Sequence, residues 1–325
     1  MLAKRDNTVM KGVLLDQGSL DAGDLDLSTL EGCFSHWRSY PETRPEQLAE
    51  RIVDAEVVIS NKVRLDGNPL RQARNLRLVC IAATGTNNVD LEAARERGIA
   101  VSNVLAYATP SVVEHVFTQL LALVRHSREY AARMDREDWQ RAAHFCLLEP
   151  PIHELAGKTL GIVGYGELGK GVARVAEAFG MEVLLAQRPG GAPQAGRIPL
   201  MELLPRVDVL SLHCPLTEQT RNLIGAAQLA AMKPGAILIN TARGGMVDET
   251  ALRQALESGR LGGAALDVLA EEPPRSGNPL LEAGLPNLIV TPHIAWASVE
   301  SRQRLVAELA ANVQAFQRGA ARNRV

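Results

Sequence analysis

Short runs of apolar residues alternate with stretches of helical spacing along most of the chain. In the first part, apolar runs at residues 12–15, 57–60, 78–82 and 99–101 have the length and composition of buried strands. Polar and apolar positions between these runs have the spacing of helices. This alternation predicts an α/β layer with a parallel sheet.

A longer apolar stretch at residues 111–125 follows this layer. Its apolar side chains cover most of a helical surface, which predicts a helix buried between layers. The polar residues 126–144 predict a helical arm, which leads to a break at Pro150 and Pro151.

A second α/β series begins after these prolines. Apolar runs at 158–163, 181–186, 207–213, 236–240, 263–268 and 288–291 predict a second parallel sheet. The periodic stretch at residues 299–316 predicts a last helix, which we expect to fold back onto the first layer.

The composition narrows the class of protein. The length of 325 residues and the hydrophobic content of 46% are sufficient for two packed cores. The formal net charge of −2 gives no electrostatic field that would attract nucleic acid or an anionic membrane. The four cysteines lack metal-ligand spacing, so no metal site is expected. No apolar stretch reaches the ~18 residues of a membrane span, and no signal-type apolar run follows the N-terminus. We therefore expect a cytoplasmic protein with small-molecule ligands.

A glycine motif predicts a dinucleotide site. It follows the apolar run 158–163 and opens a helical stretch, as a pyrophosphate-binding turn requires. The first glycine permits a tight turn, the second lets the backbone approach the pyrophosphate, and the third lets helix and strand pack. The anion then lies at the positive N-terminus of the helix. The residues of the motif are Gly164, Tyr165, Gly166, Glu167, Leu168 and Gly169.

The position that reads the cofactor ribose is unusual. Proteins specific for NAD place a carboxylate there, about 20 residues after the glycines, whereas this chain has Gln187 and Arg188. Gln187 can bind a ribose hydroxyl without repelling a 2′-phosphate, and Arg188 can pair with that phosphate or lie in solvent. The choice between NAD(H) and NADP(H) stays open.

Polar side chains follow three later apolar runs. Arg243 lies beside two glycines, Asp267 and Glu272 come after the next run, and His293 follows the last. Each alone is more typical of a surface turn or a structural position. Together they supply an anchor for a carboxylate, a proton donor, and a carboxylate that keeps the donor protonated, which is what carbonyl reduction by hydride requires.

The order and spacing of these motifs resemble the D-2-hydroxyacid dehydrogenase family over nearly the whole chain. The motifs are Gly164–Gly169, His213-Cys214-Pro215, residues 240–245, Asp267 with Glu272-Pro273, and Pro292-His293. Residues 82–90 and 293–298 are similar to the glycerate dehydrogenase, or hydroxypyruvate reductase, branch.

This resemblance implies two Rossmann-like, doubly wound domains. Residues 1–103 and 293–325 would form a substrate domain that is discontinuous in sequence, and residues 104–292 would form the dinucleotide-binding domain. Hydride transfer between NAD(P)(H) and a small 2-keto or D-2-hydroxy acid would take place between them. Helices around residues 104–150 would form a homodimer.

The resemblance also implies residue roles. Arg243 would bind the substrate carboxylate and keto oxygen, His293 would be the acid/base, Glu272 would favour its protonated form, and Asp267 would hold the nicotinamide carboxamide. Further cofactor contacts would come from His213, Cys214, Pro215, Thr220, Thr241 and Ala242. Substrate contacts would come from Thr84, Gly85, Lys62 and Trp296.

Two other functions are compatible with the fold. A phosphite or formate dehydrogenase would share the fold, but the formate branch has a glutamine where this chain has Glu272. A dinucleotide-sensing protein like the related co-repressors would keep the triad, but it would carry extensions that this sequence lacks. Lys62 stands where some relatives that bind phosphorylated substrates carry an arginine, and the lack of an arginine pair argues against a phosphate-bearing substrate. A surface lysine is the alternative interpretation of Lys62.

Overall fold

The computed structural model describes residues 10–325, so the expectation about the N-terminal sequence lies outside the described residues. The chain forms two compact units. One holds residues up to Ala108 together with Ala297–Val325, and the other is Thr109–Trp296. The first unit is therefore discontinuous in sequence, as expected, and the divisions fall a few residues beyond the boundaries expected at 103 and 292.

A parallel sheet of five strands forms the centre of the first unit. Its strands are all parallel and lie in the order β2-β1-β3-β4-β5. Successive strands are therefore added to one side of β1 and then to the other, so the strand order reverses between β1 and β3. The strands are β1 Lys11–Leu14, β2 His36–Ser39, β3 Val57–Ser60, β4 Leu78–Ile81 and β5 Ala100–Ser102. The α-helices are α1 Ser28–Glu31, α2 Pro45–Ile52, α3 Gly67–Gln72, α4 Leu91–Glu96 and α12 Val299–Gln317.

Helix α12 completes the first unit from the far end of the sequence. Asn312 Nδ2 donates to Asn103 O at 2.8 Å, and Arg304 Nε donates to Tyr107 O at 2.8 Å. Leu305, a further α12 residue, is fully buried. The expectation that the last helix folds back onto the first layer is confirmed.

A parallel sheet of six strands forms the centre of the second unit, in the order β11-β10-β9-β8-β6-β7. All six strands are parallel, and the strand order reverses between β6 and β8. The strands are β6 Thr159–Val163, β7 Glu182–Leu185, β8 Val209–Leu212, β9 Ala236–Asn240, β10 Leu261–Leu266 and β11 Leu288–Val290. The α-helices are α5 Thr109–Val124, α6 Ser127–Asp135, α7 Glu167–Ala178, α8 Leu200–Leu203, α9 Ala226–Ala231, α10 Glu249–Glu257 and α11 Pro279–Glu282.

Helix α5 is the buried helix that the apolar pattern predicts. It packs against α7 at Gly171, where a Cβ atom would lie 2.8 Å from Val113 Cγ2. The rings of Phe117 and Phe179 stack with centroids 5.3 Å apart. This packing fixes α5 against the sheet that carries the glycine motif.

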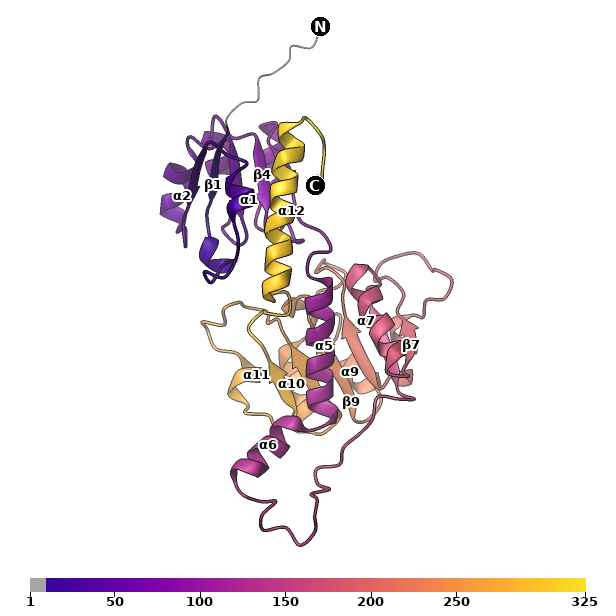
Figure 1. Cartoon of the computed structure of the whole chain (residues 1–325). Coiled ribbons are helices and arrows are strands. Elements are labelled where there is room, and N and C mark those ends of the chain that lie inside the picture. Colours follow the sequence, from indigo (N-terminus) through magenta and orange to yellow (C-terminus); the bar gives the residue numbers. More distant parts are fainter. Residues whose placement is uncertain (1–9) are drawn as a thin grey trace. The chain divides into compact units, whose positions relative to one another are not determined.

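Two elements differ from the expectation. The apolar pattern misses β2, because its residues His36–Ser39 are polar or half-buried at the sheet edge. The polar arm is helical only over α6, and the coil after it leads away from the sheet of its unit (Figure 1). In this coil Phe145 is 89% and Leu148 79% exposed, whereas Leu147 is half-buried. Within residues 10–325, no helix has both the length and the apolar character needed to cross a membrane.

Candidate active site

The glycine motif forms the turn between β6 and α7. Gly164 has a φ of 96°, and a Cβ atom on it would lie 2.6 Å from Cys214 N and from His213 C. The turn after β6 therefore lies directly against the turn after β8. These are the carboxyl ends of the two strands between which the chain reverses direction, the place where open α/β sheets bind ligands.

The space above the second glycine fits a pyrophosphate. Nothing lies within 4 Å of the position that a Cβ atom on Gly166 would take, whereas a Cβ atom on Gly169 would lie 2.2 Å from Gly164 O. No side chain caps the N-terminus of α7, so its first N–H groups are available to an anion. Residues 164–169 therefore fit the pyrophosphate group of a dinucleotide.

Two buried polar atoms also fit a dinucleotide. His213 Nδ1 and Thr241 Oγ1 are enclosed and have no hydrogen-bond partner among the described residues. Enclosure lowers the pKa of His213 to about 4, although the residue as a whole is half-buried, so the ring is neutral. Buried polar groups normally have partners, and these two lie at the ends of adjoining strands. A polar ligand at this edge of the sheet would supply the hydrogen-bond partners that these two atoms lack.

The segment after β7 carries two arginines and no carboxylate between Glu182 and Glu202. Gln187 Nε2 donates to Gly191 O at 3.1 Å, and Arg188 is exposed. The guanidinium of Arg197 lies over the ring of Tyr165, 5.0 Å from its centroid. The sequence did not point to Arg197, because its place beside the glycine motif depends on this loop.

Glu272 and His293 form the central pair of the site. His293 Nδ1 lies 2.6 Å from Glu272 Oε2. The side chain of His293 is 27% exposed and that of Glu272 is 34% exposed. The backbone N–H of Leu269 donates to the other carboxylate oxygen at 2.9 Å and so fixes the carboxylate. The ring nitrogen Nε2 is then the one that can exchange a proton with a substrate.

Asp267 orients the backbone that carries His293. Its side chain is 1% exposed and accepts hydrogen bonds from the N–H groups of Ile294 and Ala295 and from Thr291 Oγ1. His293 has a φ of 57°, and its N–H donates to Asp267 O at 2.9 Å. A left-handed conformation is uncommon for histidine and persists only where surrounding contacts hold it. The carboxamide role expected for Asp267 stays a prediction.

Arg243 lies in the turn after β9. The side chain of Asn240 bonds Arg243 O and Ala242 N across this turn. A Cβ atom on Gly244 would lie 1.9 Å from Leu269 C, so the turn lies directly against the backbone that leads to Glu272. The structure therefore brings Arg243, Asp267, Glu272 and His293 together at the carboxyl ends of β9, β10 and β11.

The expected substrate contacts in the first unit lie at the carboxyl end of its sheet. Lys62 follows β3, and its N–H donates to the buried carboxylate of Asp16 at 2.6 Å. Thr84 follows β4, where Thr84 Oγ1 donates to Val104 O and Asn103 Nδ2 donates to Thr84 O. The sequence did not point to Asp16, which fixes the turn after β3 from the end of β1.

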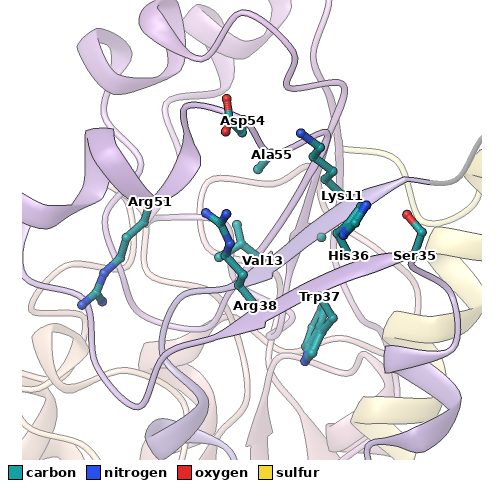
Figure 2. A pocket seen from close by; sticks show the side chains of 10 residues that line it. Lys11, Val13, Ser35, His36, Trp37, Arg38, Arg51, Asp54 and Ala55 are labelled. Atoms are coloured by element: carbon teal, nitrogen blue, oxygen red, sulfur yellow. The ribbon is translucent and has the colours of Figure 1, made fainter.

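A cavity of about 460 Å³ lies elsewhere in the first unit (Figure 2). It is formed by β1, β2 and the residues after α2, and the side chains of Lys11, Arg38 and Asp54 point into it. It contains none of the expected site residues. Lys11 and His36 begin their strands, so the cavity includes the amino ends, opposite the edge where such sheets bind ligands. Among the described residues, no cluster of His, Cys, Asp or Glu could hold a metal ion.

Comparisons with known proteins identify the family of this chain. Residues 117–295 match the family described as "D-isomer specific 2-hydroxyacid dehydrogenase, NAD binding domain". The chain is 49% identical over 315 residues to a glycerate dehydrogenase from Methylorubrum extorquens, which covers 96% of this chain and 98% of the relative. It is 38% identical over 317 residues to a hydroxypyruvate reductase from Blautia hydrogenotrophica, covering 95% and 98%.

A solved structure shows the same fold. The TT0316 protein from Thermus thermophilus superposes with a TM-score of 0.84 at 37% identity, covering 97% of this chain and 100% of that one. The chain therefore belongs to the D-isomer specific 2-hydroxyacid dehydrogenase family and is an oxidoreductase that uses a nicotinamide dinucleotide.

Proposed function

We propose that this protein interconverts hydroxypyruvate and D-glycerate, and also reduces glyoxylate. The observation that carries the proposal is the Glu272–His293 pair, at 2.6 Å, beside an arginine on the next strand end. Reduction of a 2-keto acid needs a cation for the carboxylate and a proton donor for the neighbouring keto oxygen. The glycerate dehydrogenase that is 49% identical supports the choice of substrate.

His293 transfers the proton in the proposed reaction. In reduction, its Nε2–H donates to the keto oxygen while that oxygen gains negative charge, and in oxidation Nε2 takes the hydroxyl proton back. Glu272 stabilises the imidazolium and holds the ring through Nδ1. The bound nicotinamide supplies or accepts the hydride.

Arg243 anchors the substrate in this proposal. Its guanidinium can bind a carboxylate with two parallel hydrogen bonds, which orients the keto carbon. We propose that the backbone at Thr84 and Gly85 clamps the same carboxylate, and that Lys62 and Trp296 line the substrate site. A hydroxyl group at the far end of hydroxypyruvate suits a site without a pair of arginines for phosphate.

We propose that Thr109–Trp296 is the cofactor unit and that it binds NADP(H) at least as well as NAD(H). The support is the absence of a carboxylate after β7, where a negative charge would repel a 2′-phosphate, and the presence of Arg188. The other cofactor contacts proposed from the sequence are those of the glycine motif and of the turns after β8 and β9.

Initial rates test this function. We expect purified protein to oxidise NADPH and NADH with hydroxypyruvate and with glyoxylate, whose aldehyde accepts hydride readily. Turnover of pyruvate should be slower, because it is a ketone and its methyl group cannot form the hydrogen bond that the hydroxymethyl group of hydroxypyruvate can. Chiral chromatography should identify the product of hydroxypyruvate as D-glycerate. Absence of turnover with all three acids would overturn the proposal.

We also propose a cytoplasmic homodimer. The coil after α6 presents Phe145 at 89% and Leu148 at 79% exposure, and exposed apolar groups of this kind mark protein contacts. The four cysteines are unpaired, as in a reducing compartment. Sedimentation equilibrium should give twice the chain mass, and Phe145→Asp with Leu148→Asp should lower it, while a monomeric wild type would contradict the dimer.

A further inference from the structure

Helix α5 contacts the segment that carries the catalytic histidine at two points. His115 Nε2 lies 3.0 Å from Thr291 Oγ1, and Ser111 Oγ donates to Ala295 O at 2.7 Å. Ser111 and His115 are one helical turn apart, so they lie on the same face of α5. They therefore hold the two ends of residues 291–295, with His293 in the middle.

The direction of the hydrogen bonds follows from a count of protons. Thr291 has one hydroxyl proton and donates it to Asp267 Oδ1 at 2.6 Å. Its oxygen can then only accept from His115, so Nε2 of His115 carries a proton. The chain of donors runs from His115 through Thr291 to the Asp267 carboxylate, which lies 3.6 Å from the same Nε2.

His115 suits this task because it is enclosed and uncharged. Its side chain is 14% exposed, and the polar groups that face its Nε2 are Thr291, the Asp267 carboxylate and the amide nitrogen of Gln119. This nitrogen lies 3.4 Å away and donates no hydrogen bond to Nε2 when Nε2 carries the proton. Burial lowers the pKa of His115, against the opposing effect of Asp267. The ring therefore stays neutral at neutral pH and keeps one N–H to donate.

We propose that His115 is a positioning residue for His293: its Nε2–H holds Thr291 and Asp267 in place and so fixes the left-handed backbone from which His293 projects. The Asp267 carboxylate accepts the N–H groups of Ile294 and Ala295, so a displacement of Asp267 moves the loop directly. The proposal rests on the proposed role of His293, and it assigns His115 no contact with substrate.

Two substitutions break the link and one preserves it. His115→Phe removes the donor, Thr291→Val removes the hydroxyl alone, and His115→Gln keeps an N–H at similar reach. We expect the first two to lower kcat for hydroxypyruvate by about 10- to 100-fold, because small displacements of a reacting group cost that much. The double variant should lose no more than either single variant, since both break one link. His115→Gln should stay within about threefold of wild type, because it retains the hydrogen bond.

Two further readouts separate positioning from general destabilisation. The solvent deuterium isotope effect on kcat should rise in His115→Phe, because proton transfer becomes slower than the other steps. Amide hydrogen exchange should accelerate in residues 291–296. The control Val116→Ala, buried on the same helix, should lower Tm and change neither readout.

The outcomes are distinguishable. If wild type turns over no 2-keto acid, the proposed function fails, and exchange in residues 291–296 still decides whether His115 positions the loop. If His115→Phe matches wild type in exchange and in isotope effect, or if His115→Gln is as impaired as His115→Phe, the positioning proposal is overturned.

Discussion

The two ring nitrogens of His293 have separate tasks. Nδ1 contacts the carboxylate of Glu272, and Nε2 is left for the substrate oxygen. Arg243 is placed by the side chain of Asn240 and by the close approach of Gly244 to the next turn. The chemistry proposed for the site therefore depends on residues that never touch the substrate.

Glu272→Gln tests the charge of the pair. Glutamine keeps the shape and a hydrogen-bonding oxygen but loses the negative charge that stabilises the imidazolium. We expect kcat for hydroxypyruvate reduction to fall by about 10- to 100-fold, less than the ~10²- to 10⁴-fold that general acid catalysis contributes, because the ring of His293 can still donate its proton. Cofactor affinity, measured by fluorescence titration, should not change. A kcat equal to that of wild type would show that the charge has no role.

Arg188→Ala tests the reading of the cofactor ribose. Only NADPH offers a 2′-phosphate, and a charge-assisted hydrogen bond is worth about 1.5–3 kcal/mol, so NADPH should bind roughly 10- to 100-fold more weakly and NADH nearly as before. Arg197→Ala is the matched variant, because Arg197 is the other arginine of the segment after β7. The guanidinium of Arg197 lies over the ring of Tyr165 in the glycine motif. Equal losses for both cofactors in Arg188→Ala would show that Arg188 does not read the phosphate.

At the scale of elements, the sequence pattern predicts buried strands best. Residues 57–60 and 236–240 are strands at the predicted bounds, because both are buried along their whole length. The edge strand β2 escapes the pattern because one side of it faces solvent. His115 and Thr291 escape for another reason: they are 176 positions apart in the sequence, and only the fold brings them together.

The glycine turn allows a prediction at this scale. Gly166→Ala places a methyl group in open space with a φ of −83°, so Tm should hardly change, but the methyl group occupies the pyrophosphate position. Losing one charge-assisted hydrogen bond, worth about 1.5–3 kcal/mol, should weaken cofactor binding by about 10- to 100-fold. Gly169→Ala should instead lower the unfolding free energy by about 1–3 kcal/mol, because its methyl group overlaps Gly164 O. Thermal melts and cofactor titration of both variants check this contrast, which fails if Gly166→Ala binds normally.

At the scale of the whole molecule, the change of the unfolding free energy with pH should depend on His213. Its pKa is lowered from 6.5 to about 4 in the folded chain, so the unfolded chain binds the proton more readily between these values. Stability is then fully present above pH 6.5 and is lost as the pH falls, by about 3 kcal/mol at pH 4. Denaturant melts without cofactor should show a smaller loss of unfolding free energy at low pH in His213→Asn than in wild type. The control is His36→Asn, at an exposed position, which should leave the loss as it is in wild type. Identical pH dependence in wild type and His213→Asn would contradict the assignment.

The family, the two-unit division and the strand-end site agree with one function. Motif order alone indicated the family, while the placement of Asp16, Arg197 and His115 required the folded chain, because each acts through a contact with a distant segment. The central claim is that His293 gives the proton to a 2-keto acid.

The most direct test is kcat for hydroxypyruvate reduction in wild type and His293→Ala, at saturating cofactor. We expect a loss of about 10²- to 10⁴-fold in the variant, with cofactor affinity retained. A variant that turns over hydroxypyruvate at the wild-type rate would contradict it.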